Sequence, residues 1–271
     1  MDGDKQSHDK GPLLGRQVAG SNHYDPGLLF PVPRANARQS LQSQFEGFGE
    51  DVWHAYELSW LSATGMPQMF LGTFSIPASS VNIVESKSFK LYLNSLNGHA
   101  FSTKEDACDT IVRDLSLVAG ATVSLVLAHV EHVEYDGSVL DGDCLDHLDV
   151  SVPDSADARL LTAIAGDAKV YTHLMRSLCP VTAQPDWATM IVQTRGVSPE
   201  PEGLLRYLLA YRNHQEFHEQ CVERVYTDLW HQLGPEYLSV GALYTRRGGL
   251  DICPWRCSLD IPAPRYRVNR Q

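Results

Sequence analysis

The chain has 271 residues, of which 43% are hydrophobic and 20% charged. This composition is typical of a globular protein and excludes a mostly disordered or fibrous chain, and the length favours two units at roughly 150 residues per domain. With 22 Lys and Arg against 33 Asp and Glu, the formal net charge is −11, the opposite of the usual balance in a protein that binds nucleic acid. No run reaches the ~20 apolar residues of a membrane helix, and the first residues lack the apolar core of a signal peptide. We therefore expect a cytoplasmic protein that contacts neither membranes nor nucleic acid directly.

The cysteines and the acidic residues indicate no metal site by themselves. In a reducing compartment the six cysteines are expected to be free thiols, and Cys253 and Cys257 lack a second pair to complete a tetrahedral zinc site. The acidic excess is concentrated in residues 105–160, which hold 13 acidic and 2 basic residues. Because this segment lacks the Gly and the terminal Glu of a calcium loop, we interpret it as a solvated face. Its regularly spaced carboxylates are Asp141, Asp143, Asp146 and Asp149.

The first half of the chain is predicted to hold an irregular arm followed by strands and paired helices. Residues 1–50 are rich in Gly, Pro, Asn and Gln without a sustained period, which indicates the arm. Beyond it, alternating apolar residues predict strands and a 3.6-residue period predicts helices. The second helix has a capping box, in which Ser102 precedes Glu105 by three positions. The expected strands cover residues 54–61, 68–76, 121–130 and 148–152, and the expected helices cover residues 86–96 and 102–118.

The second half repeats this order of elements after a linker at residues 153–166, which is rich in Pro, Asp, Ser and Ala. Antiparallel strands with paired helices between them predict an α+β layer rather than a doubly wound parallel sheet. We therefore divide the chain into an arm (1–50), a first module (51–155) and a second module (156–271). The strands expected in the second module cover residues 170–175, 189–194 and 237–245, and the helices cover residues 202–211 and 216–233.

A faint repeat in the sequence supports two copies of one unit. At one constant offset, Leu61 is paired with Cys179, so that one copy has an aliphatic residue where the other has a reactive one. This pattern predicts two copies with different roles, of which only the second keeps the reactive residue. The residues that align at this offset are Ser59 with Ser177, Thr64 with Thr182 and Pro67 with Pro185.

Cys179 is a candidate nucleophile because it lies in a polar loop between two predicted strands, fixed by Pro180 and Pro185. Loops on rigid strands often carry reactive groups. Taken alone, however, a free cysteine is more often a small buried hydrophobe, and local context leaves both interpretations open. Asp186, seven residues further on, is either a site residue or a turn residue after a proline.

The segment His-Gln-Glu-Phe-His-Glu-Gln-Cys at residues 214–221 opens the last predicted helix. His218 and the Glu after it resemble the start of a His-Glu-x-x-His metalloprotease motif, but Val222 stands where the second histidine is required. His214, His218 and Cys221 could share a face and bind a metal, although no fourth ligand is evident. The simpler alternative is a helix N-terminus with acidic residues near its positive dipole end.

The segment Val-Glu-Ser-Lys-Ser-Phe-Lys-Leu-Tyr at residues 84–92 marks a change from strand to helix. Backbone amides at a helix start, with Lys87 and Lys90 beside them, can receive a phosphate group. The simpler alternative is an ordinary helix cap with solvated lysines. The sequence has no Gly-Lys-Ser/Thr loop, and Gly47-Phe48-Gly49 lacks the third glycine of a dinucleotide fingerprint, so any nucleotide must bind without those loops.

Four motifs together resemble one enzyme family. They are Glu-Ser-Lys-Ser-Phe-Lys-Leu-Tyr at 85–92, Cys-Pro-Val-Thr-x-Gln-Pro-Asp at 179–186, Glu-Phe-His-Glu-Gln-Cys at 216–221 and Tyr-Thr-Arg-Arg-Gly-Gly-Leu-Asp at 244–251. The chain, from about residue 20, resembles the long two-module form of the 7-cyano-7-deazaguanine reductases, the NADPH-dependent nitrile reductases of queuosine biosynthesis. The resemblance implies tandem tunnelling-fold (T-fold) modules, with antiparallel sheets backed by paired helices, and a homodimer. It implies NADPH as co-substrate and no required metal.

The resemblance also implies the roles of individual residues. Cys179 would attack the nitrile of 7-cyano-7-deazaguanine to form a thioimide, which two hydrides then convert to 7-aminomethyl-7-deazaguanine. Asp186 would donate a proton, for which burial or a neighbouring negative charge must keep it protonated, and His218 would act as a proton shuttle. The implied substrate contacts are Val84, Glu85, Ser86, His218 and Glu219, and the implied NADPH contacts are Ser86, Lys87, Arg247 and Gly248.

Two other functions stay open from the sequence. One is a zinc-dependent, cyclohydrolase-like enzyme of the same fold, which binds a purine-like ring and uses a metal with water. The other is a non-catalytic module that binds a purine or pterin, in which Cys179 would be unreactive.

Overall fold

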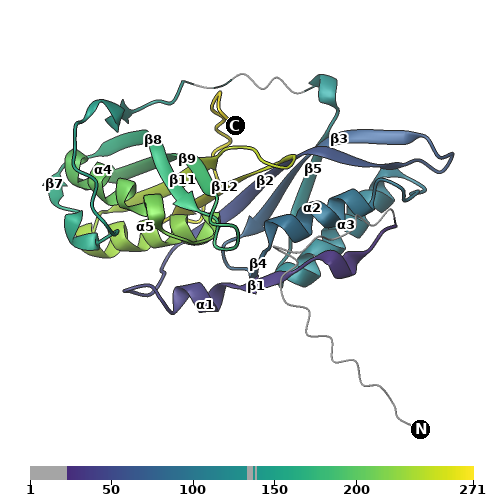
Figure 1. Cartoon of the computed structure of the whole chain (residues 1–271), viewed down its shortest axis with the longest axis horizontal. Helices are drawn as coiled ribbons and strands as arrows, with labels where there is room; N and C mark the ends of the chain where they lie inside the picture. Colours follow the sequence, from purple (N-terminus) through teal and green to yellow (C-terminus); the bar gives the residue numbers. More distant parts are fainter. Residues whose placement is uncertain (1–22, 133–136, 138) are drawn as a thin grey trace, which may run out of the picture.

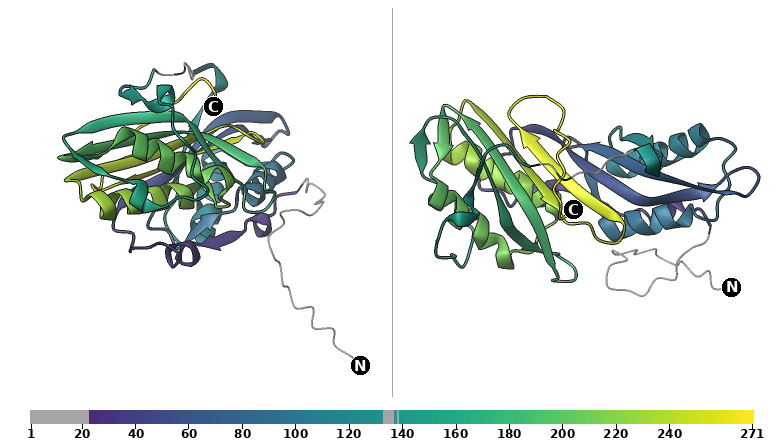
Figure 2. Two further views of the ribbon diagram at one scale, coloured as in Figure 1. Left: turned by 60° about the vertical axis from the view of Figure 1, so that its left-hand side comes forward. Right: turned by 90° about the horizontal axis from the view of Figure 1, so that it is seen from above.

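The computed structural model describes residues 23–132, 137 and 139–271, and its main feature is one long, twisted β-sheet (Figures 1 and 2). Its strands are β2 (Phe48–Leu61), β3 (Pro67–Pro77), β5 (Ser124–Ala128), β6 (Asp143–Cys144), β8 (Ala168–Leu178), β9 (Pro185–Arg195), β11 (Tyr237–Tyr244) and β12 (Leu250–Cys257). Within the described residues the sheet has eight strands in the order β5-β3-β2-β12-β11-β9-β8-β6. Neighbouring strands are antiparallel, except that β6 pairs with β8 in parallel at one edge.

Two pairs of helices cover one side of this sheet (Figure 1). They are α2 (Ser86–Ser95), α3 (Lys104–Ala119), α4 (Pro201–Leu209) and α5 (His218–Leu233). Their apolar faces form two cores, one against β2 and β3 and the other against β8, β9 and β11. The prediction of an α+β protein with antiparallel sheets backed by paired helices, the T-fold arrangement, is confirmed. None of the helices in the described ranges has the length and apolarity needed to span a bilayer.

The arm predicted over residues 1–50 differs from the structure. Residues 1–22 lie outside the described residues, but the rest contains regular elements, and β2 already starts at Phe48. Pro31 and Pro33 are the end residues of a short strand, where a proline is tolerated because one edge needs no N–H donor. This proline-rich composition concealed the pairing. The elements are β1 (Pro31–Pro33), which pairs with β4 (Asn82–Val84), and α1 (Arg34–Arg38).

Several predicted boundaries are also corrected. Helix α3 is capped by the hydroxyl of Thr103, which accepts from the Asp106 amide, so the predicted cap at Ser102 is one residue too early. Residues 148–152 form no strand. The linker at 153–166 contains β7 (Ala163–Ala165), which pairs with β10 (Val197–Pro199). Short 3₁₀ helices complete the described chain: η1 (Pro26–Leu28), η2 (Val130–His132), η3 (Leu145–His147), η4 (Ala158–Leu160) and η5 (Ala210–Asn213).

Strand β12 was not predicted, and it joins the two halves of the sheet. It pairs with β11 on one side and with β2 on the other, and every residue in it is buried. A strand buried on both faces shows no alternation of polar and apolar residues, and Pro254 in its middle further argues against a strand. The C-terminal segment crosses the face of the sheet opposite the helices, where Ala263 and Val268 pack near β12.

The internal repeat is visible in the hydrogen bonding, with a correction of one residue. Leu61 pairs with Pro67 and donates its N–H to His99, while Leu178 pairs with Pro185 and donates to His214. Leu61 therefore corresponds to Leu178, not to Cys179. Two carboxylates show the same relation, because Glu85 caps α2 and Glu200 caps α4.

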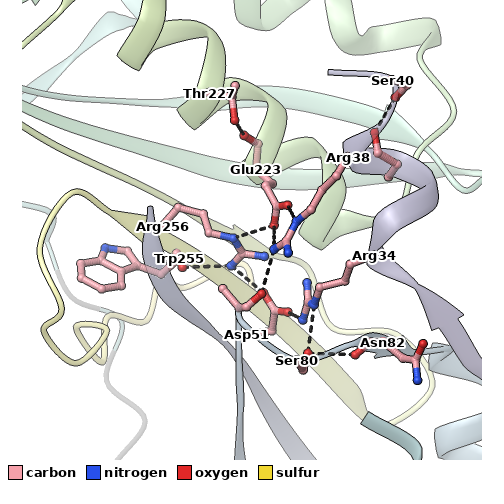
Figure 3. Close-up of polar contacts among 12 residues, drawn as sticks. Arg34, Arg38, Ser40, Asp51, Ser80, Asn82, Glu223, Thr227, Trp255 and Arg256 are labelled. Atoms are coloured by element: carbon pink, nitrogen blue, oxygen red, sulfur yellow. Dashed lines mark hydrogen bonds and ion pairs between the residues drawn. The ribbon is translucent and has the colours of Figure 1, made fainter. Parts of the chain in front are cut away.

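A buried network of charges fastens the junction between the halves (Figure 3). Arg256 on β12 is fully buried and bonds Asp51 on β2 at 2.8 Å and Glu223 on α5 at 3.1 Å. Arg34 of α1 bonds Asp51 at 2.5 Å, and Arg38 of α1 pairs with Glu223. Because each carboxylate faces two guanidinium groups, the desolvated charges are compensated. The network fixes α5 against the sheet one helical turn beyond its N-terminus.

Candidate active site

Two adjoining cavities open where the halves of the chain meet. An outer cavity of about 240 Å³ and an inner one of about 10 Å³ share Ser86, Cys179, His218, Arg247 and Ile252 in their walls. The inner cavity alone has room for about one water, so a ring bound against its walls must also fill part of the outer cavity. The walls come from the N-terminus of α2, the loop after β8, the N-terminus of α5 and the turn between β11 and β12. The structure thus brings together residues of the four sequence motifs, which lie up to about 160 positions apart in the chain. All the predicted substrate contacts line the inner cavity: Val84, Glu85, Ser86, His218 and Glu219.

Cys179 is the first residue after β8, in a loop held by its own backbone. Its N–H donates to Gln184 at 2.9 Å, and its carbonyl accepts from Ala183, which takes the left-handed conformation with φ 54°. The side chain is only 5% exposed. Burial opposes ionisation, but hydrogen bonds from the Thr182 hydroxyl, from loop amides and from Arg247 outweigh it, so the pKa of the Cys179 thiol lies below its ordinary value. The loop therefore favours a thiolate.

Asp186 lies on β9 beside Cys179, between two basic side chains. Its Oδ1 is 2.8 Å from Arg247 Nη1, and its Oδ2 is 3.1 Å from His218 Nε2. The carboxyl group is buried. The groups beside it are, however, a guanidinium and an imidazole rather than the neighbouring negative charge that the sequence analysis considered.

His218 is the first residue of α5, and its ring stacks on Tyr244 at 3.7 Å with an interplanar angle of 10°. Neither ring nitrogen has a hydrogen-bond partner of good geometry within the described residues. Burial lowers the pKa of His218; Asp186 opposes this shift and Arg247 adds to it. Burial therefore favours the neutral ring, whose Nε2 faces Asp186.

The two glutamates differ in what they already bind. Both oxygens of Glu85 accept backbone N–H groups of α2, from Lys87 and Ser88 at 2.8 Å. Glu219 is 2% exposed, and burial, assisted by the negative charge of Asp51, raises its pKa to about 8. Burial also raises the pKa of Glu85, and the helix amides reduce that shift. A purine-like ring that donates N–H groups would stabilise the charged form of either carboxylate.

The predicted NADPH contacts line the outer cavity together: Ser86, Lys87, Arg247 and Gly248. Gly248 has φ 61°, and a Cβ at this position would lie 3.2 Å from Cδ and Nζ of Lys90. The absence of a side chain thus leaves room between the turn and the lysines. Lys87, Lys90, Arg247 and the helix N-terminus are positively charged groups at this cavity, of which Lys90 also pairs with Glu57 and Arg247 with Asp186. Such groups fit the diphosphate of the cofactor.

The metal set considered from sequence is not assembled. His214 Nε2 is 2.9 Å from Glu216, whereas His218 faces Asp186. Cys221 is fully buried, which raises the pKa of its thiol, and its sulfur is not a ready ligand. Within the described residues, ligand atoms come within 4.8 Å of one another in two other groups, which are His54 with Asp251 and Cys253, and Cys144 with Asp146 and His173.

Sequence reasoning missed three contributions to this site. Arg247 was expected to bind the cofactor, but its guanidinium lies on Asp186 and contacts the Cys179 sulfur. Thr182 supplies a hydrogen bond to the thiol, and Tyr244 supplies the ring under His218. Thr182 and Tyr244 belong to two of the quoted motifs, so the signal was present without an assigned role.

Comparisons with known proteins give one consistent family. Residues 21–127 match the family described as the N-terminal part of nitrile reductase, 7-cyano-7-deazaguanine reductase, and residues 185–262 match the family described as QueF-like protein. A crystal structure of the apo form of the archaeosine synthase QueF-Like aligns with 41% of this chain and all of its own, at 18% identity and a TM-score of 0.31, which is too low to compare the folds.

Curated relatives match nearly the full length. The protein from Chromohalobacter salexigens is 46% identical over 95% of this chain and 96% of its own, and that from Paraburkholderia phytofirmans is 47% identical over 95% and 97%. A relative from Bordetella pertussis is 46% identical over 95% and 97%. All three are named NADPH-dependent 7-cyano-7-deazaguanine reductase. Since identity and coverage are both high, the chain belongs to the family of NADPH-dependent 7-cyano-7-deazaguanine reductases.

Proposed function

We propose that this protein reduces the nitrile group of 7-cyano-7-deazaguanine to the aminomethyl group of 7-aminomethyl-7-deazaguanine, in the pathway to queuosine. The reaction consumes two NADPH and two protons for each nitrile, and NADPH supplies the two hydrides. A nitrile is a poor hydride acceptor, and covalent capture by a thiolate makes its carbon more reactive. The chain contributes the nucleophile, the proton donors and the ring-binding carboxylates.

The observation that carries this proposal is the state of Cys179. A buried thiol ordinarily resists ionisation, but here Thr182, the loop amides and Arg247 lower its pKa. Its sulfur faces the cavity into which Glu219 and His218 also project. Attack by this thiolate on the nitrile carbon, with a proton added to nitrogen, gives a thioimide. After the first hydride adds to that carbon, the C–S bond breaks, the thiolate leaves and an imine remains for the second hydride.

Asp186 and His218 are the groups placed to move protons. His218 Nε2 and Asp186 Oδ2 lie 3.1 Å apart, and both residues line the inner cavity together with Cys179. We assign Asp186 as the donor to the nitrile nitrogen and His218 as the shuttle that resupplies it, since a neutral imidazole both accepts and donates a proton. Arg247, bonded to Asp186 at 2.8 Å, holds this carboxyl in place beside Cys179.

Glu219 is the main recognition group for the deazaguanine ring. As a carboxylate it accepts two hydrogen bonds, from the ring N–H and the exocyclic amine, in a charge-assisted bidentate pair. Glu85 provides a second acceptor that the helix amides hold rigidly. Val84 and Ser86 complete the wall beside the ring.

The test mixes the protein with 7-cyano-7-deazaguanine in the absence of NADPH. We expect a mass increase equal to one substrate molecule in the intact-mass spectrum, together with a thioimide absorbance. Cys179→Ala should bind the nitrile without forming the adduct, and addition of NADPH to the wild-type adduct should discharge it to the amine. The same adduct on the variant, or none on the wild type, would contradict the covalent route.

The finer predictions belong to this proposal. We place the protein in the cytoplasm as a homodimer that does not bind nucleic acid directly and requires no metal. The division into two modules, 51–155 and 156–271, is kept as a description of two copies of one unit. The shared register of the two hairpins supports it.

A further inference from the structure

The turn that carries Arg247 and Gly248 rests on an irregularity in β2. The ladder between β2 and β3 loses register between Ala55 and Leu58, so Tyr56 and Glu57 form a bulge. Bulges next to active sites commonly redirect side chains. In β2 the side chain of Tyr56 points to Arg246 of the turn, and that of Glu57 points to Lys90 of α2.

Tyr56 contacts the turn between β11 and β12 in several ways. The guanidinium carbon of Arg246 lies 3.5 Å from the centroid of its ring. Its N–H donates to the carbonyl of Gly249 at 3.0 Å. Its hydroxyl donates to Asp251, where β12 begins, and accepts from Arg267 of the C-terminal segment. Tyr56 thus contacts the turn at both ends, with its ring at Arg246 and its backbone N–H at Gly249.

Glu57, the other residue of the bulge, contacts α2. Its carboxylate is 3.6 Å from Nζ of Lys90. Gly249 has φ 78°, a conformation that favours glycine, and a Cβ there would lie 2.5 Å from Cδ of Glu57. The bulge therefore contacts both the turn and a lysine of α2.

The second copy of the fold has an equivalent bulge, but different residues form it. Strand β8 has an equivalent irregularity between Thr172 and Met175. There the redirected residues are His173 and Leu174, and His173 bonds Thr189 on the neighbouring strand. The bulge thus belongs to the repeated fold, while the tyrosine and glutamate occur only in the copy that supports the arginine turn.

We propose that Tyr56 is a positioning residue for NADPH. It holds the Arg246–Gly249 turn so that Arg247 and Gly248 face the outer cavity, without touching the nitrile. This inference rests on the proposed function, because it takes the outer cavity as the NADPH site.

The test measures NADPH binding and adduct formation separately. Tyr56→Ala removes the ring, and an arginine–aromatic contact of this kind is worth about 5- to 30-fold in an equilibrium constant, which bounds the effect of a less ordered turn on binding. We expect the dissociation constant of NADPH, from a fluorescence titration, to rise severalfold and by no more than about 30-fold. Adduct formation with the nitrile alone should fall by a clearly smaller factor than NADPH affinity, because Arg247 keeps its own ion pair with Asp186 at 2.8 Å. Tyr56→Phe keeps the ring under Arg246 and should restore most of the affinity.

Tyr237 offers a matched control, since Arg195 lies 5.1 Å over its ring, away from both cavities. Tyr237→Ala should leave NADPH binding unchanged. An unchanged dissociation constant in Tyr56→Ala, or a parallel loss of NADPH binding, adduct formation and melting temperature, would overturn the positioning role. Absence of the adduct in wild type would instead refute the proposed function, since NADPH binding is measured independently of it.

Discussion

Substrate affinity should depend on pH through Glu219. Burial and the charge of Asp51 raise its pKa to about 8, so at neutral pH most molecules hold the proton that must leave before the carboxylate can accept two N–H donors. Below pH 8 the apparent dissociation constant should therefore rise about tenfold for each pH unit, reaching about 100-fold between pH 9 and pH 6. The direction is fixed, because affinity is lost as pH falls through the raised pKa.

The assay is calorimetric titration of Cys179→Ala with 7-cyano-7-deazaguanine from pH 6 to pH 9, since this variant removes both the adduct and the titration of the thiol. In a Glu219→Gln background the amide carries no titrating proton, so the dissociation constant should be high and flat across the range. A constant affinity between pH 6 and pH 8 in Cys179→Ala would refute the assignment of Glu219 as the ionised ring acceptor.

Three further perturbations probe other parts of the structure. Glu223→Gln leaves buried Arg256 short of a partner and should cost about 3–5 kcal/mol of unfolding free energy in urea; less than about 1 kcal/mol would contradict the network. Thr182→Val raises the thiol pKa of Cys179, so adduct formation should slow roughly tenfold at pH 7 and recover at higher pH, whereas a pH-independent loss would count against this explanation. Gly248→Ala imposes a left-handed conformation on alanine, so we expect the free energy of unfolding to fall by about 1–2 kcal/mol. NADPH should also bind more weakly in a fluorescence titration, and wild-type stability and affinity would contradict the role given to Gly248.

The parts of the fold that could be predicted are those whose burial follows a local period. Helix α3 buries Ala107, Ile111 and Leu115 at helical spacing, and its prediction was accurate to a residue or two. Strand β12 has no such period, because partners on both sides and layers on both faces bury all of it. The predicted alignment of Leu61 with Cys179 was one residue off because the loop after β8 is one residue longer than the loop after β2. A constant offset between the two copies cannot represent such an insertion.

The candidate site could be predicted as a set of residues but not as a geometry. Motifs identified Cys179, Asp186 and His218, and the structure brings them to one cavity. The contact of Arg247 with Asp186 depends on how β11 and β12 meet β9 and β2, which no local pattern encodes. The partners of Arg256 likewise come from a strand and a helix far away in sequence, so its burial could not be inferred from its neighbours.

The position of β12 has a consequence for synthesis of the protein. Ala55 pairs with Leu250, so one of the central ladders of the sheet joins segments about 200 residues apart in the chain. On the ribosome, the β2–β3 hairpin emerges early with one edge unpaired, and such an edge is prone to association with other chains. That edge stays open until residues 250–257 leave the exit tunnel. The turn bearing Arg247 is fixed at the same step, so a nascent chain gains its protected edge and its complete cavity together.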